Sequence, residues 1–110
     1  MKATEILNAA EKHLADRGTT YDKPKGERSM QKTITAFNAI TDQSLTVEQG
    51  WLFMTLLKAV RTQQGNYKPD NYEDGAAYFA LAGEQASIDR IKPGEIIEKH
   101  NKTIVGQTRY

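Results

Sequence analysis

The sequence contains no cysteine, only three prolines and a single tryptophan among its 110 residues. The absence of cysteine excludes disulfides, thiolate nucleophiles and zinc-thiolate sites, and it is typical of proteins from a reducing compartment. No uncharged stretch approaches the roughly 20 residues that span a bilayer, and residues 1–18 lack the apolar run of a signal peptide. We therefore expect a cytoplasmic protein that has no membrane partner.

An excess of charge of one sign is also missing. Fifteen Lys and Arg residues stand against fourteen Asp and Glu residues, which gives a net charge of +1. Such a balance provides no overall field for non-specific binding of nucleic acid, so we do not expect nucleic acid as a partner. Any anion must be bound by a local cluster of basic side chains.

Apolar residues recur at helical spacing along most of the chain, which predicts an all-α fold. We expect helices over residues 4–16, 29–41 and 47–63, and a fourth, alanine-rich helix from residue 70 through residue 82. Gly18 is placed to end the first helix. Ser29 can cap the second helix, Thr46 with Gln49 forms a capping box for the third, and Asp70 with Glu73 resembles the same device for the fourth.

A chain of this length predicts one domain, a four-helix bundle-like fold with its core in residues 4–88. Residues 19–28 contain Pro24 and Gly26 and predict a loop. Residues 89–110 predict a short helix near 94–100 followed by a polar tail. His13 and His100 have no neighbours at metal-ligand spacing, so we expect no zinc site.

The short link GNYKP makes the third and fourth helices antiparallel neighbours. Counting from this turn places Lys58 level with Asp74, and Arg61 level with Asp70 or Asn71. Two interpretations remain open. The charged residues form a salt-bridge cluster that fixes the hairpin, or Lys58 and Arg61 bind the oxygens of a phosphate. In the second case, Asp70, Glu73 and Asp74 are candidate ligands of a hydrated Mg²⁺ ion.

The loop after the first helix adds basic side chains around an aromatic ring. Arg17 and Arg28 are candidate phosphate ligands, while Tyr21, together with Tyr78 of the fourth helix, is a candidate for stacking on a base. Lys23 and Lys25 are better explained as solvated charges of the loop.

The segments DRGTTYDKPKGERSM, FNAIT, LTVEQGWLFMTLLKAVR and DNYEDGAAYFALAGE resemble an uncharacterised family of small proteins from tailed phages and prophages. The resemblance covers residues 16–84. That family is in turn distantly similar to the all-α MazG-type nucleotide pyrophosphohydrolases, which hydrolyse nucleoside triphosphates with magnesium. YEDGAAYFALA resembles their second acidic element, with Asp74 at its final aspartate and Asn71 in place of its glutamate. The first acidic pair is missing, because Trp51 lies three residues after Glu48.

Three functions follow as hypotheses. The chain binds a phosphorylated, nucleotide-like small molecule, and as a phage factor it counters a host defence signal. Alternatively it is a magnesium-dependent pyrophosphohydrolase, although the missing carboxylates favour binding over hydrolysis. In the third hypothesis it is an interaction module whose charged hairpin is purely structural. We also expect a homo-oligomer, because the alanine-rich face of the fourth helix and the surfaces of Met54, Tyr78 and Phe79 exceed what one small core can cover.

Overall fold

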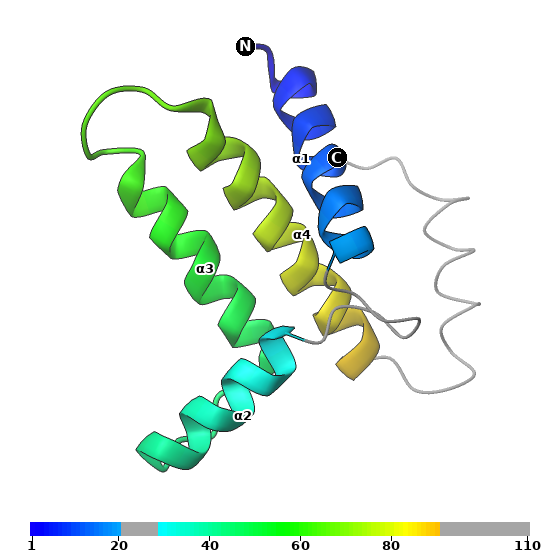
Figure 1. Cartoon of the computed structure of the whole chain (residues 1–110), viewed down its shortest axis with the longest axis vertical. Helices are drawn as coiled ribbons and strands as arrows, with labels where there is room; N and C mark the ends of the chain where they lie inside the picture. Colours follow the sequence, from blue (N-terminus) through cyan, green and yellow to red (C-terminus); the bar gives the residue numbers. More distant parts are fainter. Residues whose placement is uncertain (21–28, 91–110) are drawn as a thin grey trace.

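In the computed structural model, which describes residues 1–20 and 29–90, all regular secondary structure is α-helical. The four helices are α1 (Ala3–Thr20), α2 (Ser29–Thr41), α3 (Val47–Arg61) and α4 (Pro69–Arg90). Helix α4 lies between α1 and α3, and α2 projects from one end of α3 (Figure 1). The expected all-α, bundle-like fold is confirmed.

Within the part of the chain that the structure describes, no helix is both long and apolar enough to cross a membrane.

Helices α3 and α4 form the antiparallel hairpin that the short link predicted, and they share the largest helix–helix contact (Figure 1). The predicted capping box of α3 is present: the Thr46 hydroxyl accepts from the Gln49 backbone N–H at 3.1 Å, and the Gln49 side chain accepts from the Thr46 N–H at 2.9 Å. In the turn, Gly65 has a φ of 77°, a left-handed conformation that favours glycine. The rings of Tyr67 and Tyr72 lie 5.9 Å apart and brace the start of α4.

Several helix ends differ from the sequence prediction, and the largest difference is at the end of α4, which runs to Arg90 instead of residue 82. Helix α4 begins at Pro69, so Asp70 lies inside its first turn and the capping box of Asp70 with Glu73 is wrong. Proline is favoured at the first helical position, because its missing N–H has no intrahelical partner there. Helix α1 likewise runs past Gly18 to Thr20, since a glycine costs a helix only about 1 kcal/mol.

Helix α2 packs on α3 alone among the described helices. The link between them is closed by the side chain of Asn38, which donates to the Leu45 carbonyl at 2.9 Å and accepts from the Leu45 N–H at 3.0 Å. Met30 and Ile34 of α2 rest directly on Gly50 of α3, where a side chain would not fit. This glycine therefore allows the close approach of α2.

The core of the described chain is small. Five hydrophobic residues are buried, and each belongs to one of the four helices: Ala10, Ile34, Trp51, Ala77 and Ala82. The apolar stripe expected for α2 is only partly covered, because Phe37 is exposed and Ile40 keeps 82% of its surface in solvent. The four helices thus cover each other incompletely, and α3 in particular keeps an apolar side in solvent.

The predicted loop over residues 19–28 is wrong at residues 19 and 20, which belong to α1, and its remainder lies outside the described residues. The predicted short helix near residues 94–100 and the tail also lie outside them.

The contact at Gly50 leads to a test of how α2 is held. In Gly50→Ala, the new methyl group would lie 2.5 Å from the Met30 sulfur and 2.9 Å from the Ile34 Cδ1 atom, so these side chains must shift and the packing of α2 on α3 is weakened. Gly83→Ala is the matched control, because a methyl group there meets nothing within 4 Å. We expect hydrogen exchange to show lost protection in α2 for Gly50→Ala, and a gain in stability of about 0.5–1 kcal/mol for Gly83→Ala. Unchanged protection of α2 in Gly50→Ala would contradict the close contact.

Candidate functional site

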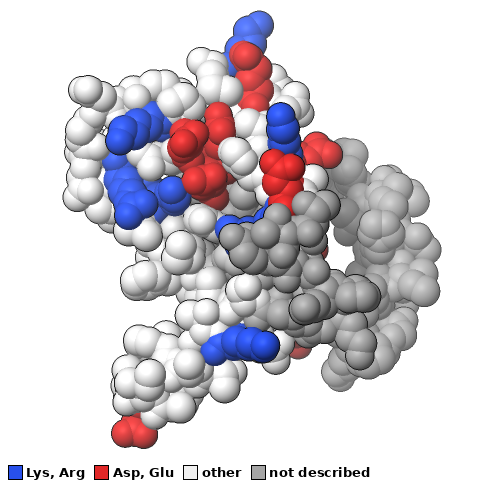
Figure 2. Space-filling view, in the orientation of Figure 1, with Lys and Arg blue, Asp and Glu red and all other residues white. Residues whose placement is uncertain are grey.

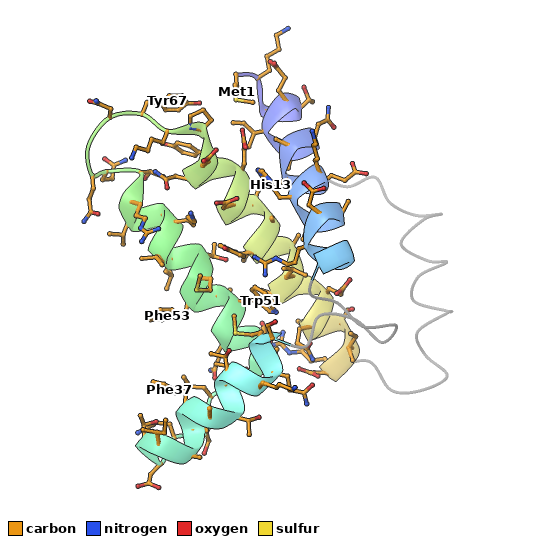
Figure 3. The ribbon with its side chains drawn as sticks, viewed as in Figure 1. Met1, His13, Phe37, Trp51, Phe53 and Tyr67 are labelled. Carbon is orange, nitrogen blue, oxygen red and sulfur yellow. The ribbon has the colours of Figure 1, made fainter. Side chains whose placement is uncertain are left out.

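A group of charged side chains joins α4 to both of its neighbours. The Lys58 ammonium of α3 lies 3.0 Å from one oxygen of Asp74, which confirms that these residues are level in the hairpin. On the other side, the His13 Nε2 of α1 lies 3.0 Å from Glu73 and 3.8 Å from the second oxygen of Asp74 (Figure 3). Two adjacent carboxylates of α4 therefore bind side chains from two different helices.

Burial explains why these carboxylates need partners. The side chain of Glu73 is 11% exposed and that of Asp74 is 29% exposed, while the side chain of Lys58 is 14% exposed. A carboxylate that loses most of its water must be compensated by a hydrogen bond or a cation. His13 provides this for Glu73, and Lys58 provides it for Asp74.

Sequence reasoning missed His13, because nothing in the sequence gives the register of α1 against α4. A signal was nevertheless present. His13 and Arg17 lie four residues apart, so they share one side of a helix, and this side also carries the apolar residues Ala10 and Leu14. Polar residues on the packed side of a helix are candidates for buried hydrogen bonds.

Next to this group, an arginine covers two stacked rings. Trp51 of α3 and Tyr78 of α4 have ring centroids 5.7 Å apart and planes that differ by 22°. The Arg17 guanidinium lies 5.7 Å from the Trp51 ring and 5.6 Å from the Tyr78 ring, within the range of cation–π attraction. Trp51 is buried, and Tyr78 remains partly accessible.

The first of two open hollows, which we call the Arg17 pocket, lies between α1 and α4. It has a volume of about 300 Å³ and combines an aromatic edge with groups of both charges. Its lining consists of His13, Leu14, Asp16, Arg17, Asp74, Ala77 and Tyr78.

The second hollow, which we call the cationic pocket, lies at the turn end of the α3–α4 hairpin. It has a volume of about 370 Å³. Three basic residues, two amides and one carboxylate line it: Lys58, Arg61, Lys68, Gln64, Asn71 and Asp70. Figure 2 shows basic side chains gathered at this end of the molecule, beside a group of acidic side chains. An anion placed here would meet several N–H donors at once.

The predicted ligand residues thus divide into two groups. Lys58 and Arg61 lie together in the cationic pocket, and Arg17 and Tyr78 lie together in the Arg17 pocket. The Lys58–Asp74 ion pair connects the groups, because Lys58 lines one pocket and Asp74 lines the other.

Two further candidates, Tyr21 and Arg28, lie outside the described residues.

The three candidate magnesium ligands have different surroundings. Glu73 binds His13, Asp74 binds Lys58, and Asp70 lies in the cationic pocket. Among residues 1–20 and 29–90, no group of three or more His, Asp or Glu side chains is placed to hold a metal ion. Within this part of the chain, Arg61 and Asp70 line one pocket but do not form the expected salt bridge.

Comparison with known proteins gives a family. A family model described as a domain of unknown function, DUF6378, matches residues 5–86. Neither the curated proteins nor the solved structures contain a match to the chain. The matched range takes in every described residue that lines the two pockets.

The Lys58–Asp74 pair can be tested by a double-mutant cycle. Both partners are more than two-thirds buried, so the cost of Lys58→Met should fall between that of a surface pair and that of a fully buried pair, at about 1–3 kcal/mol. Adding Asp74→Leu removes the stranded carboxylate and should recover part of this loss, which denaturation in urea would measure. Lys12→Met, at an exposed position of α1, is the control. Additive losses in the double variant would show that the two side chains do not interact.

Proposed function

We propose that this chain, which belongs to the DUF6378 family of domains of unknown function, binds a phosphorylated small molecule in the cationic pocket. The observation that carries the proposal is the composition of that pocket, where Lys58, Arg61 and Lys68 surround an open hollow and Asp70 is the single acidic residue among the described ones that line it. A phosphate group is the common metabolite feature that needs several N–H donors at one point.

The cationic pocket keeps a net positive charge although Lys58 is paired with Asp74. Because Asp74 compensates Lys58 from the far side, the charge available to a ligand comes chiefly from Arg61 and Lys68. Arg61 presents a fork of N–H donors suited to two phosphate oxygens, and Lys68 approaches from the other side of the turn. The buried Asn71 also lines this pocket, and its side-chain amide can donate a hydrogen bond to a ligand oxygen.

A nucleotide suits the arrangement better than free phosphate does. The Arg17 pocket lies across the Lys58–Asp74 pair from the cationic pocket, and it offers the edge of Tyr78 to a planar base. We propose that the phosphate lies near Arg61 and Lys68 and that the base lies near Tyr78 and Arg17. We also propose that the protein acts in the cytoplasm.

The sequence resemblance to proteins of tailed phages and prophages supports a further part of the proposal, that the chain captures a nucleotide-like host defence signal. The distant similarity to MazG-type pyrophosphohydrolases also supports a nucleotide-like ligand. Two contacts argue for capture without hydrolysis: Asp74, which matches an acidic residue of those enzymes, is paired with Lys58, and Glu73 is hydrogen bonded to His13. His13 and Lys58 would compete with a magnesium ion for these carboxylates.

The proposal predicts that phosphorylated ligands stabilise the folded chain. A ligand at about 100 times its Kd raises the free energy of unfolding by about 2.7 kcal/mol. For a chain of this size, this corresponds to a rise in Tm of roughly 10 °C, which thermal shift measurements with inorganic phosphate, nucleoside mono-, di- and triphosphates and cyclic dinucleotides would detect. Trp51, the single tryptophan, lies beneath Arg17, so its fluorescence offers a second readout.

Matched variants then locate the site. Arg61→Ala and Lys68→Ala should each lose most of the ligand-dependent rise in Tm, whereas Lys32→Ala, an exposed lysine of α2, should keep it. If no phosphorylated compound stabilises the parent, the binding proposal is wrong and the interaction module is favoured. Magnesium-dependent release of pyrophosphate would instead establish the hydrolase.

A further inference from the structure

We infer that the exposed side of α3 is the surface through which two copies of this chain form a dimer. Phe53, Leu56 and Val60 expose 69%, 64% and 56% of their surface, and their spacing of three and four residues places them on one side of the helix. We call these three residues the α3 stripe. It lies opposite Trp51 and Lys58, which face α4, and Figure 3 shows Phe53 directed away from α4.

The α3 stripe continues into an apolar groove between α2 and α3. Phe53 lines this groove together with Phe37 and Leu45, which are also exposed, and with Met54. The groove has a volume of about 230 Å³. Helix α3 therefore has apolar residues on well over half of its circumference, and α4 covers only the side opposite the stripe.

The extent of this surface matches what a stable dimer needs. The stripe, with Phe37 and Leu45, exposes roughly 500 Å² of apolar surface, which is at the upper limit for a monomer. A standard interface buries about 800 Å² per partner, of which roughly 60% is apolar. One such surface on each copy is therefore sufficient for an interface of ordinary size.

The distribution of charge on α3 suits a second copy as the occupant. All three charged side chains of α3 are directed elsewhere: Glu48 binds Arg90 of α4 at 2.6 Å, Lys58 binds Asp74, and Arg61 lines the cationic pocket. The stripe is bounded by the neutral Gln49 and Gln63. Two identical faces repel when they carry like charges, and this face carries none.

A two-fold axis near Leu56 gives the simplest packing. When two α3 helices cross in antiparallel fashion at this residue, Phe53 of one copy meets Val60 of the other, and each contact occurs twice. Of the residues that the sequence suggested for the oligomer, Met54 lines the groove between α2 and α3. Ala77 and Ala82 are buried within one chain, and the partly accessible Tyr78 stacks on Trp51 and lines the Arg17 pocket, away from the α3 stripe, whereas Phe79 remains exposed on α4.

The full chain should sediment as a dimer at micromolar concentration. Leu56→Glu places two like charges near the axis and should raise the Kd of dimerisation at least roughly tenfold. Phe79→Glu is the matched control, because Phe79 is exposed to nearly the same extent, 62%, but lies on α4, and this variant should remain dimeric. Circular dichroism of each variant shows whether its helices are intact. A monomeric parent at 100 µM (on the order of the highest practical concentration) overturns the inference, as does a Phe79→Glu variant that alone dissociates.

A milder substitution keeps the inference testable if Leu56→Glu does not fold. The chain has no cysteine, so Leu56→Cys introduces a single thiol that can form a disulfide only between copies. A disulfide requires Cα atoms less than about 7 Å apart, which residues at a two-fold axis satisfy. Under mild oxidation, Leu56→Cys should yield a covalent dimer much faster than Phe79→Cys does. Equal rates for the two variants would place the contact outside the α3 stripe.

Discussion

The carboxylate of Asp74 makes the interaction on which the arrangement of the three long helices depends. One of its oxygens binds Lys58 of α3 at 3.0 Å, and the other lies 3.8 Å from His13 of α1. The neighbouring Glu73 completes the connection to α1 through its hydrogen bond to His13. Apolar contacts between helices tolerate sliding, whereas a hydrogen-bonded ion pair has one good geometry. These polar contacts therefore fix the register of α4 against both neighbours.

The same contacts explain why the two pockets lie where they do. Lys58 and Asp74 occupy the boundary between α3 and α4, so that the turn end of the hairpin keeps the remaining cations while the side toward α1 keeps the aromatic rings. Arg17 extends this arrangement by covering Trp51 and Tyr78, which would otherwise lie open toward α1. Under the proposed function, Lys58 and Asp74 would serve both the packing and the binding site, and a ligand of either pocket would act on the packing of the helices.

Local features of the sequence predicted much of this molecule. The capping box of Thr46 and Gln49, the antiparallel hairpin and the level of Lys58 with Asp74 all follow from spacing within about 30 residues. The pairing of His13 with Glu73 could not be predicted, because it joins residues 60 positions apart. The role of Glu73 was misjudged for the same reason, since a local capping pattern concealed a distant hydrogen bond.

The exposure of apolar side chains could not be predicted from local sequence patterns either. The helical period shows that Ile34, Phe37 and Ile40 share one side of α2, but it does not show how much of that side another helix covers. Among the described helices α2 packs on α3 alone, and of its residues only Ile34, which lies over Gly50, is buried. The number of neighbours that a helix has is a property of the whole fold.

The order of the helices along the chain has a consequence for folding. The hairpin of α3 and α4 is closed by a loop of a few residues, so it can form early from contacts that are local in sequence. Helix α1 reaches the same hairpin only after residues 21–68 have been closed into a much larger loop. The cationic pocket consists entirely of hairpin residues, whereas the Arg17 pocket needs α1. Local opening of α1 would therefore remove the Arg17 pocket while leaving the cationic pocket intact.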